Sequence, residues 1–124
     1  MKFFGIGNDI IEIKRIEKAI QKENFIKKVF TENEIKLFES KGKRAEFFAG
    51  RFSAKEAISK GLRTGFRDFS LTDIEILNDE LGKPFVIFKN SIKSYNDKYF
   101  VDISISHCKE YATAVAIIFE GGNF

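Results

Sequence analysis

The sequence predicts an α+β fold in which helices pack on an antiparallel sheet. The chain has 124 residues, of which 44% are hydrophobic and 31% are charged, and this composition is typical of one globular domain over residues 1–124. Apolar residues follow a mainly helical spacing in the first half and the alternating spacing of strands in the second half. Helices followed by hairpins are typical of α+β domains.

The N-terminal region is predicted to form one strand and two helices. Residues 3–13 carry four isoleucines and predict a strand whose start is interrupted by glycines. Residues 14–23 change to helical spacing. Thr31 and Glu34 have the spacing of a capping box, in which each side chain bonds the backbone amide of the other residue. They predict a helix that ends near Ser40.

The best-defined helix is predicted over residues 44–61. Residues 41–43, Lys-Gly-Lys, break the chain before it, and Thr64-Gly65 is expected to end it. Phe48 and Phe52 lie one turn apart on this helix and supply part of an apolar face. Because the chain holds 15 phenylalanines and no tryptophan, we expect a core built around phenyl rings.

The second half is predicted to form two hairpins separated by a short helix. Apolar runs flank a turn in each hairpin, and the last pair of runs alternates apolar and polar residues as a half-buried strand does. In order, the sequence predicts strands over residues 71–77 and 85–88 around a turn at residues 78–84, a short helix over residues 91–99, and antiparallel strands over residues 101–106 and 112–119.

Positive charge is concentrated in the first half of the chain. Residues 14–63 hold 14 lysines and arginines against seven glutamates, whereas the rest has a balance of −4 and the whole chain one of +3. A basic half is typical of proteins with an acidic partner, such as nucleic acid, a phosphorylated ligand or an acidic protein. It is also typical of a solvated helical surface, and the charge pattern alone does not separate the two.

A cytoplasmic location is expected from the sequence. Cys108 is the only cysteine, so an intrachain disulfide is impossible, and a single thiol favours a reducing compartment. The apolar run that begins at Phe3 is broken by glycines and is too short for the core of a secretory signal. No run approaches the roughly 20 apolar residues that span a bilayer.

Asp9 is a candidate ligand for a hard cation. If the first strand alternates, Gly7, Asp9 and Ile11 share a face, and a carboxylate near the interior must pair or bind a metal to offset its lost hydration. The neighbouring glycines would let a large ligand approach the backbone. The alternative is an ordinary turn aspartate at the edge of a strand.

Charged side chains form two neighbouring stripes on the helix over residues 51–60. On one stripe, Glu56 precedes Lys60 by one turn, which is also the order of an ordinary helix-stabilising ion pair. On the other, Arg51 and Lys55 are like charges one turn apart, so an anion between them, such as a phosphate, would relieve their repulsion. The complete stripes are Phe52, Glu56 and Lys60, and Arg51, Lys55 and Ser59.

His107 is the only histidine and follows the last predicted inward-facing residues of its strand. A lone histidine at this position is either a hydrogen-bonded residue at the edge of the core or a catalytic residue. Its neighbour Cys108 has no second cysteine with which to form a zinc site or a redox pair. Residues 82–84, Gly-Lys-Pro, are first of all a turn signal, and their spacing alone assigns them no ligand.

Together and in this order, the segments resemble the holo-acyl-carrier-protein synthases, the short type of 4′-phosphopantetheinyl transferase. The resemblance covers nearly the whole chain and implies the 4′-phosphopantetheinyl transferase fold, with this chain equivalent to one half of longer two-repeat relatives. It also implies a homotrimer with active sites at subunit interfaces. The matching segments are Gly5-Ile6-Gly7-Asn8-Asp9-Ile10, Lys14-Arg15-Ile16, Phe48 to Lys60 with Lys55-Glu56-Ala57 at its centre, Gly82-Lys83-Pro84 and Ser104-Ile105-Ser106-His107.

The resemblance implies transfer of phosphopantetheine from coenzyme A to a serine of apo acyl carrier protein, with release of adenosine 3′,5′-bisphosphate, in support of fatty acid biosynthesis. Asp9 and Glu56 would bind magnesium, and Glu56, or a water that it orients, would take the serine proton. Lys60 would hold the phosphates of coenzyme A, and His107 would contact the same region. The nucleotide and phosphate pocket would be lined by Arg51, Lys55, Ser59, Gly82, Lys83 and Pro84.

Arg15 and the basic helix that follows it would bind the acidic carrier protein, in agreement with the charge asymmetry. Two residues depart from the family pattern: Asn8 replaces an apolar residue, and Arg63 replaces a small or apolar one near the wall of the pocket. The preferred carrier protein, the use of acylated coenzyme A and the choice between magnesium and manganese stay open. The rival functions are a metal-dependent hydrolase of coenzyme A or a nucleotide, a nucleic-acid-binding module, and a non-catalytic trimeric scaffold.

Overall fold

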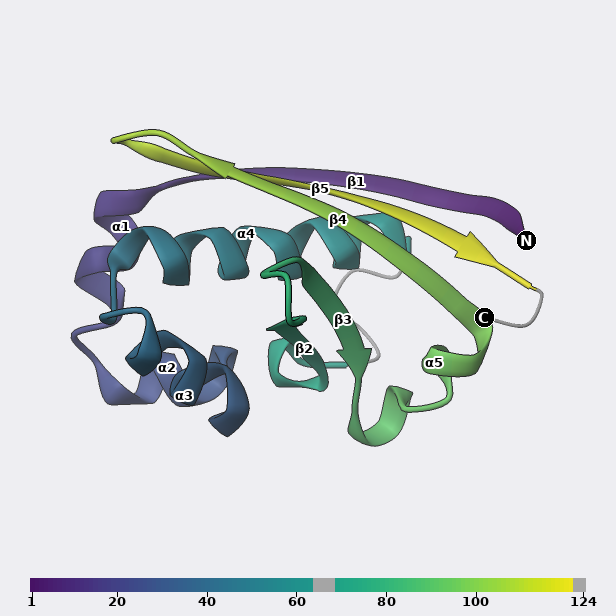
Figure 1. Ribbon diagram of the computed structural model, residues 1–124, viewed down its shortest axis with the longest axis horizontal. Coiled ribbons are helices and arrows are strands. Elements are labelled where there is room, and N and C mark those ends of the chain that lie inside the picture. The colour runs from purple at the N-terminus through teal and green to yellow at the C-terminus, as the bar shows by residue number, and fades with distance from the viewer. Residues whose placement is uncertain (64–68, 122–124) are drawn as a thin grey trace.

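A long helix lies across one face of a three-stranded antiparallel sheet and organises the molecule (Figure 1). The computed structural model describes residues 1–63 and 69–121. The sheet has the strand order β1-β5-β4, so β5 is its central strand. This arrangement confirms the α+β fold predicted from the sequence. The helix is α4 (Ala45–Gly61), and the strands are β1 (Lys2–Glu12), β4 (Tyr99–His107) and β5 (Tyr111–Glu120).

Strand β1 and helix α4 approach each other so closely that only glycine fits at the contact. A Cβ atom on Gly7 would lie 2.0 Å from the carbonyl oxygen of Ala57, and one on Gly5 would lie 2.1 Å from that of Gly61. These distances are severe overlaps with backbone atoms, which cannot rotate away. The glycines of β1 therefore make room for the helix backbone and not, as the sequence suggested, for a ligand.

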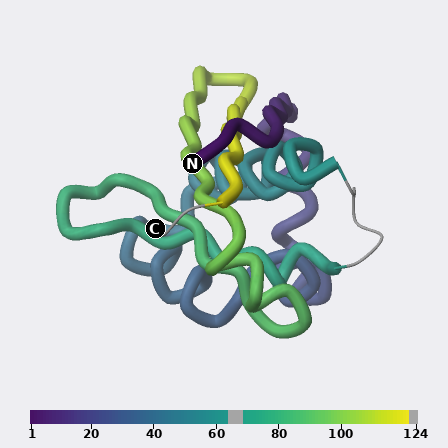
Figure 2. Tube along the Cα trace, turned by 90° about the vertical axis from the view of Figure 1, so that its right-hand side faces the viewer, coloured from purple at the N-terminus to yellow at the C-terminus, as the bar shows by residue number. Residues whose placement is uncertain are grey.

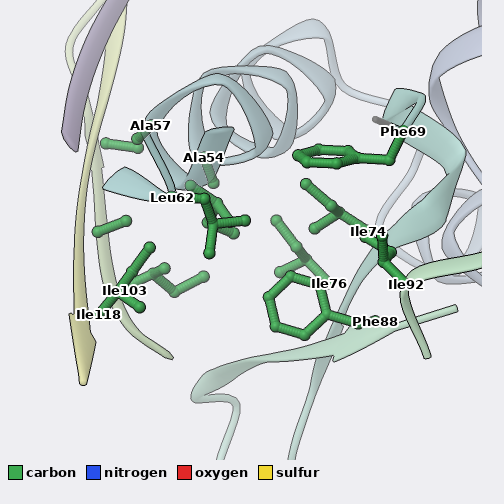
Figure 3. Close-up of a cluster of buried hydrophobic side chains, with 13 residues drawn as sticks. Ala54, Ala57, Leu62, Phe69, Ile74, Ile76, Phe88, Ile92, Ile103 and Ile118 are labelled. Carbon is green, nitrogen blue, oxygen red and sulfur yellow. The ribbon is translucent and has the colours of Figure 1, made fainter. Parts of the chain in front are cut away.

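The inner face of the sheet, α4 and a small second sheet enclose one hydrophobic cluster (Figure 3). In Figure 3, Ile103 and Ile118 of the large sheet lie on one side of this cluster, and Ile76 and Phe88 of the small sheet lie on the other. Full burial of each such side chain contributes about 1.5–3 kcal/mol relative to exposure. The small sheet pairs β2 (Ile74–Asn78) with β3 (Pro84–Phe88).

Three short helices pack beside the N-terminal part of α4 and bury a cluster of phenyl rings. The rings of Phe30, Phe38 and Phe48 contact one another with centroid distances between 4.2 and 5.4 Å, and all three are buried. This confirms the expectation that phenyl rings build much of the core. The helices are α1 (Ile13–Ala19), α2 (Glu23–Val29) and α3 (Glu32–Ser40).

The predicted helix over residues 14–23 is wrong in its length. Helix α1 ends at Ala19, and α2 begins after a turn. Helix α2 then leads to Val29 and Phe30, which are buried in the same hydrophobic cluster as Phe38 and Phe48. The capping box of Thr31 and Glu34 is present and starts α3, as predicted. The helix predicted over residues 44–61 differs from α4 by one residue.

In the second half, two predicted elements start differently from the sequence expectation. Residues 71–77 begin with a 3₁₀ turn, η1 (Leu71–Asp73), because Ser70 and Asp73 form a capping box of their own. Where one helix was predicted over residues 91–99, the chain forms η2 (Asn90–Ile92) and α5 (Tyr95–Lys98). The expected helix stop at Thr64-Gly65 lies outside the described residues.

The hairpin of β2 and β3 projects beyond the edge of the large sheet that β4 forms (Figure 2). At the opposite edge, β1 continues directly into α1. The two edges therefore offer different surroundings to the side chains of α4. Within residues 1–63 and 69–121, no helix has both the length and the apolar character needed to cross a membrane.

Candidate active site

Helix α4 and strand β1 bring charged side chains together at one edge of the sheet. Asp9 is partly buried on the inner face of β1, and its Oδ2 accepts a hydrogen bond from Ser53 Oγ at 3.1 Å. Lys60 Nζ lies 3.2 Å from Asp9 Oδ1 and donates a hydrogen bond to the carbonyl oxygen of Asn8 at 3.0 Å. Because Ser53, Glu56 and Lys60 are three and four residues apart, α4 presents all of them on one face.

The carboxyl group of Glu56 interacts electrostatically with this cluster. Burial raises the pKa of Glu56 above its ordinary value, the neighbouring charge of Asp9 raises it further, and the charge of Lys60 lowers it. Asp9, Glu56 and Lys60 thus act on one another, and we call them the carboxylate cluster. Two carboxylates against one ammonium leave this cluster with a net negative charge, which can attract a cation or a proton.

The oxygen atoms of the carboxylate cluster suit a magnesium ion. Proteins commonly bind magnesium through one or two carboxylates and leave its other positions to water and substrate phosphates. Asp9 and Glu56 supply two carboxylates whose mutual repulsion a divalent cation would relieve. Across residues 1–63 and 69–121 there is no group of three or more His, Cys, Asp or Glu residues that could hold a metal.

A pocket of about 450 Å³ opens at the other edge of the sheet, between α4, β3 and β4. Three of the residues that the family resemblance implied for ligand binding line it, namely Arg51, Pro84 and His107. Cationic and apolar groups share its walls, and this combination suits a ligand with an anionic part and a flat or apolar part. The other lining residues are Arg44, Glu46, Phe47, Gly50, Ile103, Ser104 and Ile105.

Arg51 is a buried cation in the wall of this pocket, with 5% of its surface exposed. Its guanidinium lies 4.6 Å from the centroid of the Phe47 ring, and its Nη2 donates a hydrogen bond to Asn78 Oδ1. Burial lowers the pKa of Arg51 to about 10, against the raising effect of the Glu34 charge. Its Nε has no hydrogen-bond partner among the described residues. The Nε atom is itself buried, so a pocket ligand does not reach it, but a cation in the wall of a pocket is suited to bind an anion.

The turn at Gly82-Lys83-Pro84 contributes Pro84 to the pocket wall. Gly82 has a φ of +84°, a backbone conformation that other residues adopt only with strain, so glycine is needed for the turn itself. Lys83 Nζ lies 3.7 Å from Asp102 Oδ1 in an exposed ion pair. Gly82 and Lys83 therefore shape and charge the turn beside the pocket, while Pro84 lines it.

Lys55 points into the interior, away from the pocket. Its side chain is 0% exposed, and Nζ donates hydrogen bonds to Glu34 Oε1 at 2.6 Å and to the carbonyl oxygens of Val29 at 2.6 Å and Leu71 at 3.0 Å. Burial raises the pKa of Glu34 and lowers the pKa of Lys55, and the attraction between them opposes both changes. This corrects one expectation: the anion that Lys55 binds is Glu34, and not a phosphate shared with Arg51.

Ser59 is also buried and lies outside the lining of the pocket. The sequence did not reveal Glu34 as the partner of Lys55, because the capping box already gave Glu34 a local role. In the structure Glu34 serves both purposes: Oε1 accepts from the Thr31 amide and Oε2 from the Ile76 amide, each at 2.9 Å. A lysine on a buried stripe requires an acidic partner, but the sequence does not tell which acid reaches it.

Arg15 is exposed on α1, directly after β1, so its charge is available to a partner. Asn8 is exposed on the outer face of the sheet, which explains why this departure from the family pattern does not disturb the core. Arg63 lies outside the pocket lining; its Nη2 donates to the carbonyl oxygen of Phe4 at 2.8 Å and ties the chain after α4 to β1.

The two groups of candidate residues lie on opposite edges of the large sheet. Asp9 belongs to β1 and His107 belongs to β4, and β5 separates the two strands. The structure therefore brings together two sets of predicted residues but keeps the sets apart within one chain. The first set is Asp9, Glu56 and Lys60, and the second is Arg51, Pro84 and His107.

Comparison with known proteins identifies the family. Residues 5–116 match the model of the 4′-phosphopantetheinyl transferase superfamily. The chain is 56% identical over 118 residues to a holo-[acyl-carrier-protein] synthase of Fusobacterium nucleatum, in an alignment that covers 92% of this chain and 97% of the relative.

Solved structures of such synthases have the same fold. One from Bacillus anthracis, in complex with CoA (3′,5′-ADP), has a TM-score of 0.82 and 40% identity and covers 98% of this chain and 100% of its own. One from Helicobacter pylori, in complex with coenzyme A, has a TM-score of 0.82 and 32% identity and covers 92% of this chain and 99% of its own. These similarities confirm the resemblance seen in the motifs. The chain belongs to the 4′-phosphopantetheinyl transferase superfamily.

Proposed function

We propose that this protein transfers 4′-phosphopantetheine from coenzyme A to a serine of apo acyl carrier protein. The products are the holo carrier protein and adenosine 3′,5′-bisphosphate. The reaction would take place in the cytoplasm and would support fatty acid biosynthesis. A single domain over residues 1–124 would carry this activity. Besides family membership, one observation carries the proposal: two interacting carboxylates and a lysine converge where α4 crosses β1. Such a cluster can bind a cation and a phosphate together.

Asp9 and Glu56 would hold magnesium, with Ser53 orienting Asp9 through its hydrogen bond. When bound, magnesium supplies positive charge that offsets the charge of the diphosphate and favours attack on its phosphorus. Glu56 would take the proton of the carrier serine, directly or through a water molecule, and the burial that raises its pKa favours this role.

The serine oxygen would form a bond to the phosphorus that carries pantetheine, and the bond from that phosphorus to the leaving 3′,5′-ADP would break. Lys60 would stabilise the negative charge that develops on the leaving phosphate, because its ammonium lies on the same face of α4 as Glu56. Catalysis of this kind depends mainly on positioning and electrostatics.

The nucleotide part of coenzyme A would occupy the pocket at the β4 edge. Arg51 and His107 would bind a phosphate there, and Pro84 would provide an apolar wall. Lys83 would add positive charge from the neighbouring turn. Lys55 and Ser59 would act indirectly, since both side chains are buried away from the pocket.

A homotrimer with active sites at subunit interfaces would unite the carboxylate cluster of one copy with the pocket of the next. The separation of the two groups on opposite edges of the sheet supports this assembly. The outer face of the sheet supports it too, because Ile6, Ile10 and Val115 are exposed there to 61%, 63% and 39%. Exposed apolar side chains grouped on one face are typical of a protein–protein contact.

The acidic carrier protein would bind at Arg15 and the other basic residues of α1. This helix follows β1 directly, so a carrier docked on it would present its serine near the carboxylate cluster. Exposed charges of this kind mainly increase the rate and the specificity of association. Neither a nucleic acid nor a membrane has a place in this proposal.

The activity can be tested by intact-protein mass spectrometry of an apo acyl carrier protein after incubation with this protein and coenzyme A. We expect a mass gain of one phosphopantetheine that requires magnesium, disappears with a chelator and disappears with Asp9→Ala. Asp97→Ala removes an exposed carboxylate from α5 and should leave the gain intact. Consumption of coenzyme A without modification of the carrier would indicate a hydrolase instead, and intact coenzyme A with no gain would reject the transferase.

A further inference from the structure

Lys60 is held at the place where the proposed function requires a cation. Its Nζ donates to the carbonyl oxygen of Asn8 at 3.0 Å and to Asp9 Oδ1 at 3.2 Å. The side chain of Lys60 is 56% exposed, whereas that of Asp9 is only 15% exposed and is also bonded to Ser53. Asp9 is therefore fixed in place, and Lys60 is attached mainly through its ammonium group.

A magnesium ion and the Lys60 ammonium would compete for the same carboxylate oxygen of Asp9. Oδ1 now accepts from an ammonium, and a divalent cation bound to this oxygen would place two positive groups within a few ångströms of each other. The cost is lowest if the ammonium moves, because its stem is solvent-exposed and flexible. A ligand phosphate is the natural new partner, since an ammonium binds phosphate as a strong point charge.

We propose that Lys60 and the divalent cation compete for Asp9, and that the phosphates of coenzyme A release this competition by drawing Lys60 away. This inference rests on the proposed function and adds a coupling to it: the divalent cation and coenzyme A each increase the affinity of the protein for the other. Thermodynamic linkage makes the effect reciprocal, so the factor by which coenzyme A tightens cation binding equals the factor for the reverse. The Lys60 ammonium would thus pair with Asp9 in the free protein and with the phosphates when coenzyme A is bound.

The test is a titration of the folded protein with Mn²⁺ as the probe, with free Mn²⁺ measured by electron paramagnetic resonance. In the absence of coenzyme A, Lys60→Met should bind Mn²⁺ about fivefold more tightly than the parent, which is the size of one partly exposed ion pair. With coenzyme A at saturation the two proteins should bind Mn²⁺ with similar affinity. The factor by which coenzyme A tightens Mn²⁺ binding should therefore be about fivefold smaller in Lys60→Met than in the parent. Lys93→Met removes an exposed ammonium elsewhere and should change neither value.

Unchanged or weaker binding of Mn²⁺ by Lys60→Met would overturn the competition, even if the parent transfers phosphopantetheine normally. Lys60→Gln provides a second neutral variant, and circular dichroism shows whether each variant is folded. Asp9→Asn should abolish the tight Mn²⁺ site. If the parent binds Mn²⁺ no better than Asp9→Asn does, both the competition and the metal role of Asp9 in the proposed function are wrong.

Discussion

Removal of the Lys55 ammonium should destabilise the protein strongly, because Glu34 would then carry a buried charge without its cationic partner. Both side chains are 0% exposed. Breaking a buried pair by removing one partner costs about 3–5 kcal/mol, out of a total stability of about 5–15 kcal/mol for a small domain. Lys55→Met keeps most of the apolar stem. We expect it to lose about 3–5 kcal/mol at pH 7 and to melt on the order of 10–20 °C lower.

The dependence of this loss on pH gives a sharper test. Burial raises the pKa of Glu34, and in the variant the attraction of Lys55 no longer opposes that effect. A carboxyl group with a higher pKa in the folded than in the unfolded protein stabilises the fold at low pH and loses this contribution as the pH rises through the folded pKa. The deficit of Lys55→Met should therefore shrink as the pH is lowered from 7 to 5.

Urea denaturation followed by circular dichroism at pH 7, 6 and 5 would measure both effects. The matched control is Lys27→Met, which removes the exposed ion pair between Lys27 and Glu23. An exposed pair at this spacing contributes only about 0.3–0.5 kcal/mol, so the control should change little at any pH. A loss below about 1 kcal/mol for Lys55→Met, or a deficit that is equal at pH 7 and pH 5, would refute the buried pair as a determinant of stability.

Three further changes test other parts of the structure. Gly7→Ala should prevent folding or cost more than about 3 kcal/mol, because its Cβ would overlap the Ala57 carbonyl oxygen; urea unfolding at the parent's midpoint would contradict the contact. Arg51→Met should raise the KM for coenzyme A by about 10- to 100-fold with a smaller change in kcat, and steady-state kinetics with an unchanged KM would remove Arg51 from the pocket. Ile10→Lys should convert the proposed trimer to monomers in size-exclusion chromatography with light scattering, and an unaltered mass would exclude the outer face as the contact.

Local patterns predicted the fold where the sequence itself carries the stabilising contact. The capping box of Thr31 and Glu34 joins residues three positions apart, and the alternation of β4 and its hairpin partner is visible residue by residue. The turn after Ala19 and the 3₁₀ turn at residues 71–73 were not predicted, although the second is held by a capping box of Ser70 and Asp73 that is as local as that of α3. The first depends on packing of Phe30 against distant rings, and a periodicity analysis cannot detect such contacts.

The candidate site shows the same division. The carboxylate cluster could be predicted, since Glu56 and Lys60 are one helical turn apart and Asp9 alternates onto the inner face of its strand. The inward direction of Lys55 could not, because packing against the sheet fixes the rotation of α4. The order of the strands within the sheet could not be predicted from the sequence either, so the separation of Asp9 from His107 by β5 was not foreseen.

The position of the two residue groups on opposite edges of one sheet has a genetic consequence for the proposed trimer. A chain with a defective carboxylate cluster still carries an intact pocket, and a chain with a defective pocket still carries an intact cluster. Mixed assemblies of Asp9→Asn and His107→Ala chains would then contain interfaces where two intact halves meet, about one quarter of all sites for random mixing. Two inactive alleles would therefore complement each other in the same cell. A chain defective in both halves would instead inactivate both of the sites to which it contributes in a mixed trimer.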